Sequence, residues 1–339
     1  MTQNLNKSKT VMIKWMQYLN IAIEMQQRVN NLTSVSSFLL LEFSDARELQ
    51  ILFFFIFLAL YMITLIGNLL IIAAIALDYH LHTPMYVFLM DLAMMDLGTV
   101  SVTIPKSMAN FLMNSSSISY SEWVAQVFFY LFFGTCDFAL LIVMAHDRHV
   151  AICNPLWYDR IMHKGACIWF AAATWICSLP NAMMQTGTTF ATTFCSNNIK
   201  QFFCEIPQLL KLSCCNCYLA EVWLLISVGI ITIVSYVFVI LTYVKIFAAV
   251  LRIPSVSGQK KALSTCLPHL AVISVFMFSG LFVYGRTYIE DSCSPNIIFA
   301  VIYTIIPPMF NPFICSMRNK EIKVALRKWL HLGFLSRLL

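Results

Sequence analysis

Charged side chains are scarce in this sequence of 339 residues. They make up 11% of it, and 60% of the residues are hydrophobic, whereas a soluble domain typically carries about 25% charged residues. This composition excludes an ordinary soluble domain and predicts a protein that lies in a lipid bilayer. We expect the net charge of +6 to attract the anionic inner leaflet of the membrane, and we expect no nucleic acid partner.

Several other signals are absent. No repeat and no low-complexity tract interrupts the chain, and Lys14 breaks the weak apolar patch near the amino terminus, so no cleavable signal peptide is expected. Nothing resembles a nucleophile with its base, so we expect no enzyme. His80, His82 and His163 have no cysteine or acid at ligand spacing, which argues against a metal site made from them.

Seven long apolar runs remain, and each is long enough to cross the membrane as a helix, for which about 20 residues suffice. We therefore predict an all-α membrane protein, a seven-helix bundle of one domain. The predicted spans are Gln50–Leu77, Pro84–Ser107, Trp123–Cys153, Ala166–Met184, Tyr218–Ala248, Ala262–Tyr284 and Asn296–Met317.

The distribution of lysine and arginine predicts the orientation, because cytoplasmic segments carry the excess of these residues. With the amino terminus outside, the inner loops and the tail hold 13 of them and the outer loops hold 4, although five more precede the first span. We expect an extracellular segment over residues 1–49, a transmembrane domain over 50–317 and a cytoplasmic tail over 318–339 that contains a short amphipathic helix. A glycosylation sequon at Asn31, and a weaker one at Asn114, agree with this orientation.

Three charged residues lie at membrane depth, where such groups usually serve a function. Asp96 lies in the second span, and Asp137 and Arg148 lie eleven residues apart on one face of the third. The pair of Asp96 and Asp137 allows two interpretations. The two carboxylates bind a cation such as sodium, or one of the acids is protonated and hydrogen-bonded to its neighbours. Asp91 is near the inner end of its span, and we expect it to reach water.

The adjacent pair Asp147 and Arg148 ends the third span and allows two interpretations. Arg148 either pairs locally in a resting state and is released to bind a partner, or the pair anchors the helix among the lipid headgroups. The spacing alone does not choose between them.

A series of motifs, one for each of several spans, resembles the rhodopsin-like G-protein-coupled receptors and in particular the odorant receptors. The motifs "HTPMY" and "KALSTCLPHL" favour the odorant receptors, and the resemblance covers about residues 31–330. The motifs are LIGNLLI (Leu65–Ile71), HTPMYVFLMDLAMMD (His82–Asp96), MAHDRHVAICNPL (Met144–Leu156), SY (Ser235-Tyr236), KALSTCLPHL (Lys261–Leu270) and PPMFNPFICSMRNKEIK (Pro307–Lys323).

The resemblance implies a receptor in the plasma membrane that binds small lipophilic volatile molecules. Such a receptor activates a stimulatory heterotrimeric G protein, which raises cyclic AMP. Arg148, with Asp147 as its local partner, resembles the arginine that holds the inactive state and then engages the G protein. The resemblance also assigns Asp96 and Asp137 to the sodium site, and it assigns activation roles to Tyr236, His269, Asn311 and Pro312.

The resemblance also places a ligand site among the third, fifth, sixth and seventh helices. The matching residues are mostly apolar, which suits a neutral ligand held by one or two hydrogen bonds; the alternative for each is ordinary packing or contact with lipid. The residues are Tyr130, Leu131, Gly134, Thr135, Ala220, Leu224, Met277, Gly280, Tyr284 and Thr304.

The chain departs from the family pattern at a few positions. Trp123 stands where the family has a cysteine that bonds to the second outer loop, so Cys204 lacks its usual partner and Cys215, Cys217 and Cys293 are its alternatives. The resemblance still pairs Cys195 with Cys214. Cys315 and His149 replace tyrosines of the family, and the loss of the tyrosine at position 315 is expected to weaken coupling.

These departures leave a second interpretation open, a receptor-shaped chain that folds or signals poorly. A cation-coupled transporter is a third, since Asp96 and Asp137 could relay ions, but the sequence contains no inverted repeat of the kind that many transporters show. The sequence does not reveal the odorant or the oligomeric state.

Overall fold

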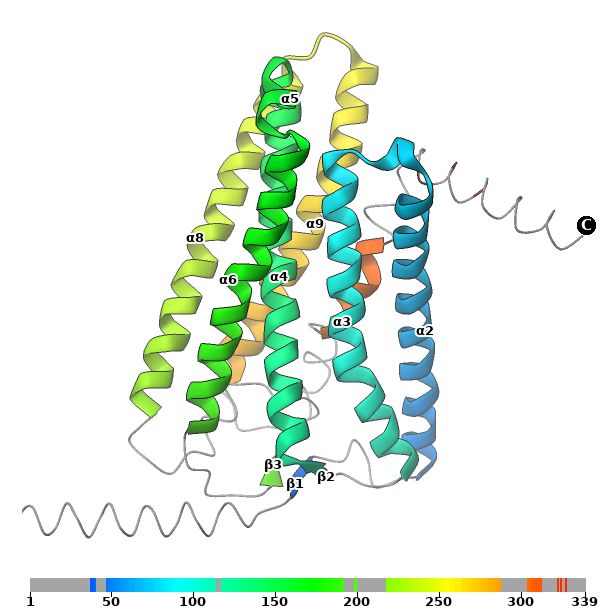
Figure 1. Cartoon of the computed structure of the whole chain (residues 1–339), viewed down its shortest axis with the longest axis vertical. Coiled ribbons are helices and arrows are strands. Elements are labelled where there is room, and N and C mark those ends of the chain that lie inside the picture. Colours follow the sequence, from blue (N-terminus) through cyan, green and yellow to red (C-terminus); the bar gives the residue numbers. More distant parts are fainter. Residues whose placement is uncertain are drawn as a thin grey trace, which may run out of the picture.

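Six long helices, roughly side by side, form most of the part of the chain that the computed structural model describes (Figure 1). That part comprises residues 37–40, 47–113, 117–191, 198–199, 218–287 and 304–312, with the single residues 322, 324 and 327. The helices are α2 (Arg47–Leu77), α3 (Pro84–Met113), α4 (Tyr120–Cys153), α6 (Lys164–Ala191), α8 (Tyr218–Leu251) and α9 (Val256–Thr287).

All six helices are long and apolar enough to cross a membrane. They confirm six of the seven predicted spans as helices. The predicted seventh span is described only over residues 304–312, which are helical. Short elements join some of these helices: 3-10 turns at Tyr79–Leu81 and Pro155–Trp157, and the single turn α5 (Tyr158–Ile161).

Several helices extend beyond the predicted spans, because the sequence estimate counted only the apolar core.

Arg47 at the start of α2 bonds to the last carbonyl groups of α3. Its guanidinium donates to the carbonyl oxygens of Phe111 and Leu112, at 2.8 Å each. Basic side chains commonly cap the last carbonyl groups of a helix in this way, and the contact joins α2 to α3.

Three short strands lie together at one end of the bundle. The strand β1 (Ser37–Leu40) pairs antiparallel with β2 (Ser117–Ser119) and parallel with β3 (Asn198–Ile199). The segments before α2, before α4 and after α6 therefore meet at what we call the strand end. The turn α5 lies at the opposite end (Figure 1), which we call the α5 end.

Close packing between helices fixes the interior. A Cβ atom added to Gly98 of α3 would lie 2.6 Å from the ring of Phe133 of α4, so only glycine fits beneath that ring. Gly67 of α2 lies against Pro312, where an added Cβ would be 3.3 Å from the proline ring. These approaches bring α2, α3, α4 and residues 304–312 around one polar centre.

Candidate functional site

Asp96 is the centre of a buried polar cluster. It lies in the middle of α3, is fully buried, and accepts hydrogen bonds from the Asn311 side chain at 2.9 Å and 3.1 Å, one to each carboxyl oxygen. The contact joins residues 215 positions apart in the sequence. A polar group in this environment is costly unless it is bonded, and Asn311 supplies those bonds.

Asn68 of α2 links the same cluster to the first helix. Its side-chain amide donates to the carbonyl oxygens of Thr64, at 3.0 Å, and Pro308, at 3.2 Å. The helical donor to the carbonyl group of Pro308 would be the backbone nitrogen of residue 312, but Pro312 has no N–H, so this carbonyl is open to the Asn68 amide. The asparagine thus joins α2 to residues 304–312.

Asp137 of α4 is buried near Asp96, and the two carboxyl groups interact electrostatically. The buried carboxyl group of Asp137 interacts with the buried hydroxyl group of Thr99, and Oδ1 of Asn311 is buried without a hydrogen-bond partner among the described residues. Small hard cations prefer oxygen ligands of this kind. The residues present therefore fit a sodium ion, whereas no group of three His, Cys, Asp or Glu suited to a metal occurs in that same part of the chain.

The expectation that Asp91 reaches water is wrong. Its side chain is buried and accepts hydrogen bonds at 3.1 Å and 3.2 Å from the indole nitrogen of Trp175 on α6. The sequence estimate considered only the depth of Asp91 along its helix, whereas α6 covers that face of α3. Asp91 therefore joins two helices.

Asp147 and Arg148 lie near the α5 end of α4, and both are buried. The Asp147 carboxyl accepts a hydrogen bond from the Tyr158 hydroxyl at 2.9 Å and also interacts electrostatically with Arg148. Burial, together with the nearby Asp147 carboxyl, raises the pKa of Tyr158, so this hydroxyl keeps its proton and remains a donor. Asp147 thus joins α4 to the turn α5.

His269 of α9 also interacts electrostatically with Arg148. Nδ1 of His269 lies 2.6 Å from the hydroxyl oxygen of Tyr243 on α8, and both side chains are buried. Tyr236 lies on α8 about two turns from Tyr243, nearer the strand end. Its hydroxyl oxygen is 3.4 Å from Oγ of Ser274 on α9. Arg148 therefore lies at a junction of α4, α8 and α9.

The candidate ligand residues are distributed over several helices. Met277 and Thr304 are buried. The α4 residues Tyr130, Leu131, Gly134 and Thr135 are half-buried, as are Leu224 and Gly280. A Cβ atom added to Gly134 would have no neighbour within 4 Å. Thr135 accepts a hydrogen bond from Asn181 of α6 at 3.1 Å, so it also contacts a helix outside the predicted site.

Trp123, which replaces the expected cysteine, is fully buried at the strand end of α4. Its ring packs edge to face on Phe190 of α6, with centroids 4.9 Å apart. This geometry is a favoured one for aromatic pairs. Packing thus fills the position where a disulfide is expected.

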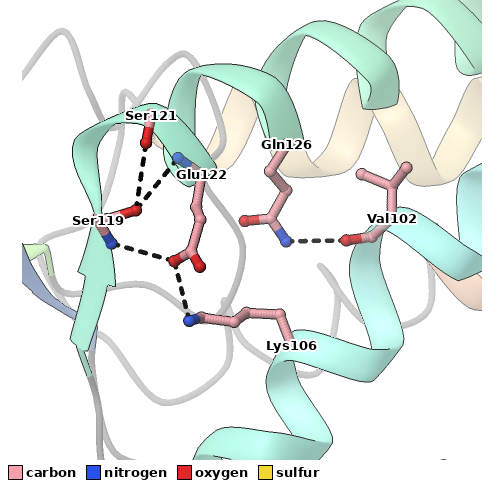
Figure 2. A network of polar contacts seen from close by, with 6 residues as sticks. All are labelled: Val102, Lys106, Ser119, Ser121, Glu122 and Gln126. Atoms are coloured by element: carbon pink, nitrogen blue, oxygen red, sulfur yellow. Dashed lines mark hydrogen bonds and ion pairs between the residues drawn. The ribbon is translucent and has the colours of Figure 1, made fainter.

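Polar contacts hold the same end of α4, as Figure 2 shows. The hydroxyl of Ser119 accepts from the backbone N–H of Glu122, and the Glu122 carboxylate accepts from the backbone N–H of Ser119, which together form a capping box. The Glu122 carboxylate also pairs with Lys106 of α3 at 3.1 Å, and Gln126 donates to the carbonyl oxygen of Val102 at 3.2 Å. These bonds tie α4 to α3.

Some predicted sites lie outside the described residues: the sequons at Asn31 and Asn114, the cysteines Cys195, Cys204, Cys214, Cys215, Cys217, Cys293 and Cys315, and the side chains of Ala220 and Tyr284. Their pairing and roles stay predictions.

Sequence reasoning missed several residues that the structure brings to these sites, among them Tyr243, Asn181, Gln185 and Trp175. Tyr243 follows Tyr236 by seven residues, which places both on one face of α8. Asn181 and Gln185 are amide side chains four residues apart within a predicted span or at its edge, which is itself a signal that they face the bundle interior. Trp175 gave no signal of its partner, because indole rings also face lipid.

Comparison with known proteins identifies the family. The family described as Olfactory receptor matches residues 57–332. The human olfactory receptors 14J1 and 14I1 are each 44% identical to this chain; the first match covers 88% of the chain and 94% of that receptor, and the second covers 91% and 100%. Olfactory receptor 1G1 of Gorilla gorilla gorilla is 43% identical over 88% of the chain and 96% of that receptor. The chain therefore belongs to the olfactory receptor family of G-protein-coupled receptors, and it is a multi-pass protein of the plasma membrane and not an enzyme.

Proposed function

We propose that this chain binds small lipophilic volatile molecules and activates a stimulatory heterotrimeric G protein, which raises cyclic AMP. The observation that carries the proposal is the junction at Arg148. It brings together Asp147 of α4, Tyr243 of α8 and His269 of α9 at one end of the bundle. We infer a second arrangement of this junction, in which the contact between Tyr243 and His269 is broken and α9 has separated from α8.

The proposed orientation places the strand end outside the cell and the α5 end in the cytoplasm. Lys164, Lys245 and Arg252 lie towards the α5 end, where the excess of basic residues belongs on the cytoplasmic side. Arg148 would then lie beside the surface that a G protein approaches. The segment that contains β1 would lie outside the cell, next to the ligand.

The proposed ligand site lies in the half of the bundle nearest the strand end. A Cβ atom added to Gly134 would meet no atom within 4 Å, and Leu131, Leu224 and Met277 are apolar. A ligand shifts a receptor between two states only if it binds one of them more tightly. We infer that the odorant favours the arrangement in which α9 has moved away from α8.

We also propose that Asp96 and Asp137 hold a sodium ion in the resting state. The buried oxygens of Asp137, Thr99 and Asn311 support the proposal because a small hard cation prefers oxygen ligands of this kind. When bound, the ion would neutralise part of the charge of the two carboxylates. Asn311 would continue to orient Asp96 through its amide protons.

The test of the receptor proposal is a cyclic AMP assay in cells that express a stimulatory G protein and the full chain, with an odorant panel. We expect Arg148→Ala to abolish the response while surface labelling stays unchanged. Lys106→Ala is the control, because Lys106 is a basic residue at the opposite, strand end of the bundle, and its partly exposed ion pair with Glu122 contributes little to stability. An unaltered response of Arg148→Ala would overturn the role assigned to Arg148, and uptake of a solute by the purified protein without nucleotide exchange would instead favour a transporter.

A further inference from the structure

Two histidines flank the pair of Asp147 and Arg148 at the α5 end of α4. His146 comes directly before the pair and His149 directly after it, and both side chains are half-buried. Histidine is the side chain whose ordinary pKa, about 6.5, lets it gain a charge close to neutral pH. A proton on either ring therefore changes the charge beside the arginine that is proposed to engage the G protein.

His149 lies against α8. Its ring interacts electrostatically with Lys245 of that helix and with His146. The thiol of Cys153, one turn further along α4, donates to the backbone carbonyl of Lys245 at 3.9 Å, so this part of α8 lies beside the face of α4 that carries His149. A proton on His149 would place a second positive charge beside the ammonium group of Lys245.

The Nδ1 atom of His149 is buried and has no hydrogen-bond partner among the described residues. A neutral imidazole can leave one ring nitrogen without a proton, whereas a protonated ring carries an N–H group at both. Protonation would thus bury a charged donor without an acceptor, which is costly. Separation of α9 from α8 would admit water to this end of the bundle, and water can accept from that donor. A proton on His149 therefore favours the separated arrangement.

His146 acts in the same direction through Asp147. The two side chains interact electrostatically, and the His146 ring packs edge to face on Phe170 of α6, with centroids 6.2 Å apart. The Asp147 carboxyl also interacts with Arg148 and accepts a hydrogen bond from Tyr158. A positively charged His146 would compete with Arg148 for this carboxylate, and so weaken the hold on Arg148.

The charged and titratable groups of this region come from five elements. Among the groups named here the one carboxylate is that of Asp147, so added positive charge gains little in the closed arrangement. A proton on His269 would break its contact with Tyr243 and act with the same sign. The groups are Asp147 and Arg148 of α4, Tyr158 of α5, Cys167 of α6, Tyr243 and Lys245 of α8 and His269 of α9.

We propose that His146 and His149 form a proton-sensitive switch that couples cytosolic pH to activation of the G protein. Acidification favours the arrangement in which α9 has separated from α8, and it raises the activity of the receptor without ligand. A rise in pH favours the closed arrangement. This inference rests on the proposed receptor function and orientation, and it adds a regulatory input at the cytoplasmic end.

The test measures nucleotide exchange on a purified stimulatory G protein by the full chain in lipid nanodiscs, at several values from about pH 6.5 to 7.5, where a histidine titrates. His146→Gln, His149→Gln and the double change remove the titrating rings, and Lys245→Gln removes the neighbouring charge. His149→Lys places a permanent charge at the same position. His80→Gln is the matched control, because His80 is exposed on the turn between α2 and α3.

Each activity is divided by that of the double variant at the same pH, which removes the pH dependence of the G protein itself. The melting temperature of each variant shows whether it remains folded. The single changes carry the test if the double change does not fold, with activities then divided by those of His149→Gln.

We expect the relative activity of the natural chain to rise about threefold as the pH falls by about one unit, within the roughly tenfold that one proton permits. His80→Gln should keep this rise, Lys245→Gln should reduce it, and His149→Lys should be as active at about pH 7.5 as the natural chain is at about pH 6.5.

Two results would overturn the inference while the receptor function stands. One is a natural chain and a double variant that activate the G protein with the same pH profile. The other is a folded His149→Lys protein that is no more active than the natural chain at the upper end of the pH range. If the folded natural chain activates no G protein at any pH, with or without odorants, the receptor function fails and the inference fails with it.

Discussion

The hydroxyl of Tyr243 and the ring nitrogen Nδ1 of His269 are 2.6 Å apart, and both side chains are buried between α8 and α9. His269 also interacts with Arg148 of α4. This hydrogen bond therefore joins the two helices beside the arginine that is proposed to engage the G protein. Breaking this bond removes a constraint on α9 at that level of the bundle.

We predict that Tyr243→Phe lowers the stability of the resting receptor by about 1 to 3 kcal/mol, because a buried ring nitrogen loses its partner. The melting temperature of the purified protein in detergent measures this effect. Basal cyclic AMP should rise as α9 is released. Tyr236→Phe is the control, since its hydroxyl makes a longer contact of 3.4 Å, and equal melting temperatures of the two variants would contradict the prediction.

We predict that the effects of changing Asp96 and Asn311 on the free energy of unfolding are not additive. Asn311→Leu should cost about 1 to 3 kcal/mol, because it removes both hydrogen bonds to a buried carboxyl group. The double change Asp96→Leu with Asn311→Leu should cost less than the sum of the single changes, since neither polar group is then left unbonded. Additive melting shifts would show that the two side chains do not depend on each other.

The proposed sodium site predicts an ion-specific stabilisation. Sodium chloride should raise the melting temperature more than choline chloride at equal ionic strength, since a ligand that binds only the folded state stabilises it, by about 2.7 kcal/mol at a hundredfold excess over the dissociation constant. Asp137→Asn should remove the difference. A difference that persists in Asp137→Asn would place sodium elsewhere.

Because Trp123 is packed in the interior, we predict that the chain folds and reaches the cell surface without the family's cysteine at this position. Trp123→Ala should lower the surface fraction sharply, because emptying a buried aromatic position costs about 3 to 5 kcal/mol. Phe129→Ala is the matched control, as that ring is 45% exposed. Surface labelling of a tagged chain, divided by labelling after permeabilisation, measures the effect. If only Trp123→Cys reached the surface, the natural chain would be the poorly folding receptor that the sequence left open.

We predict that the close packing of α3 on α4 requires glycine at position 98. Gly98→Ala should cost about 1 to 3 kcal/mol, because the new methyl group would lie 2.6 Å from the Phe133 ring and force it to move. Gly187→Ala on α6 meets no atom within 4 Å and should be neutral or slightly stabilising. The two melting temperatures test the prediction directly, and it would not survive a Gly98→Ala protein as stable as the natural one.

The membrane class, the number of spans and the family were predictable from the sequence, because apolar length and local motifs are properties of contiguous residues. The candidate residues Asp96, Arg148, His269 and Asn311 were predictable through the motifs that contain them. The ends of α3, α6 and α9 were not, since polar residues extend these helices beyond the apolar core and contacts such as that of Arg47 satisfy their ends.

Pairing between helices was beyond the reach of the sequence. Asp91 was expected to reach water, yet Trp175 of α6 covers it; Tyr243 and Asn181 were overlooked, yet they bond to His269 and Thr135. The sequence by itself determined which segments are helices in the membrane and which of them carry polar residues. Only the tertiary structure decided which of those residues meet, because a polar side chain in a bundle must find a partner on a neighbouring helix, and the packing of the helices selects that partner.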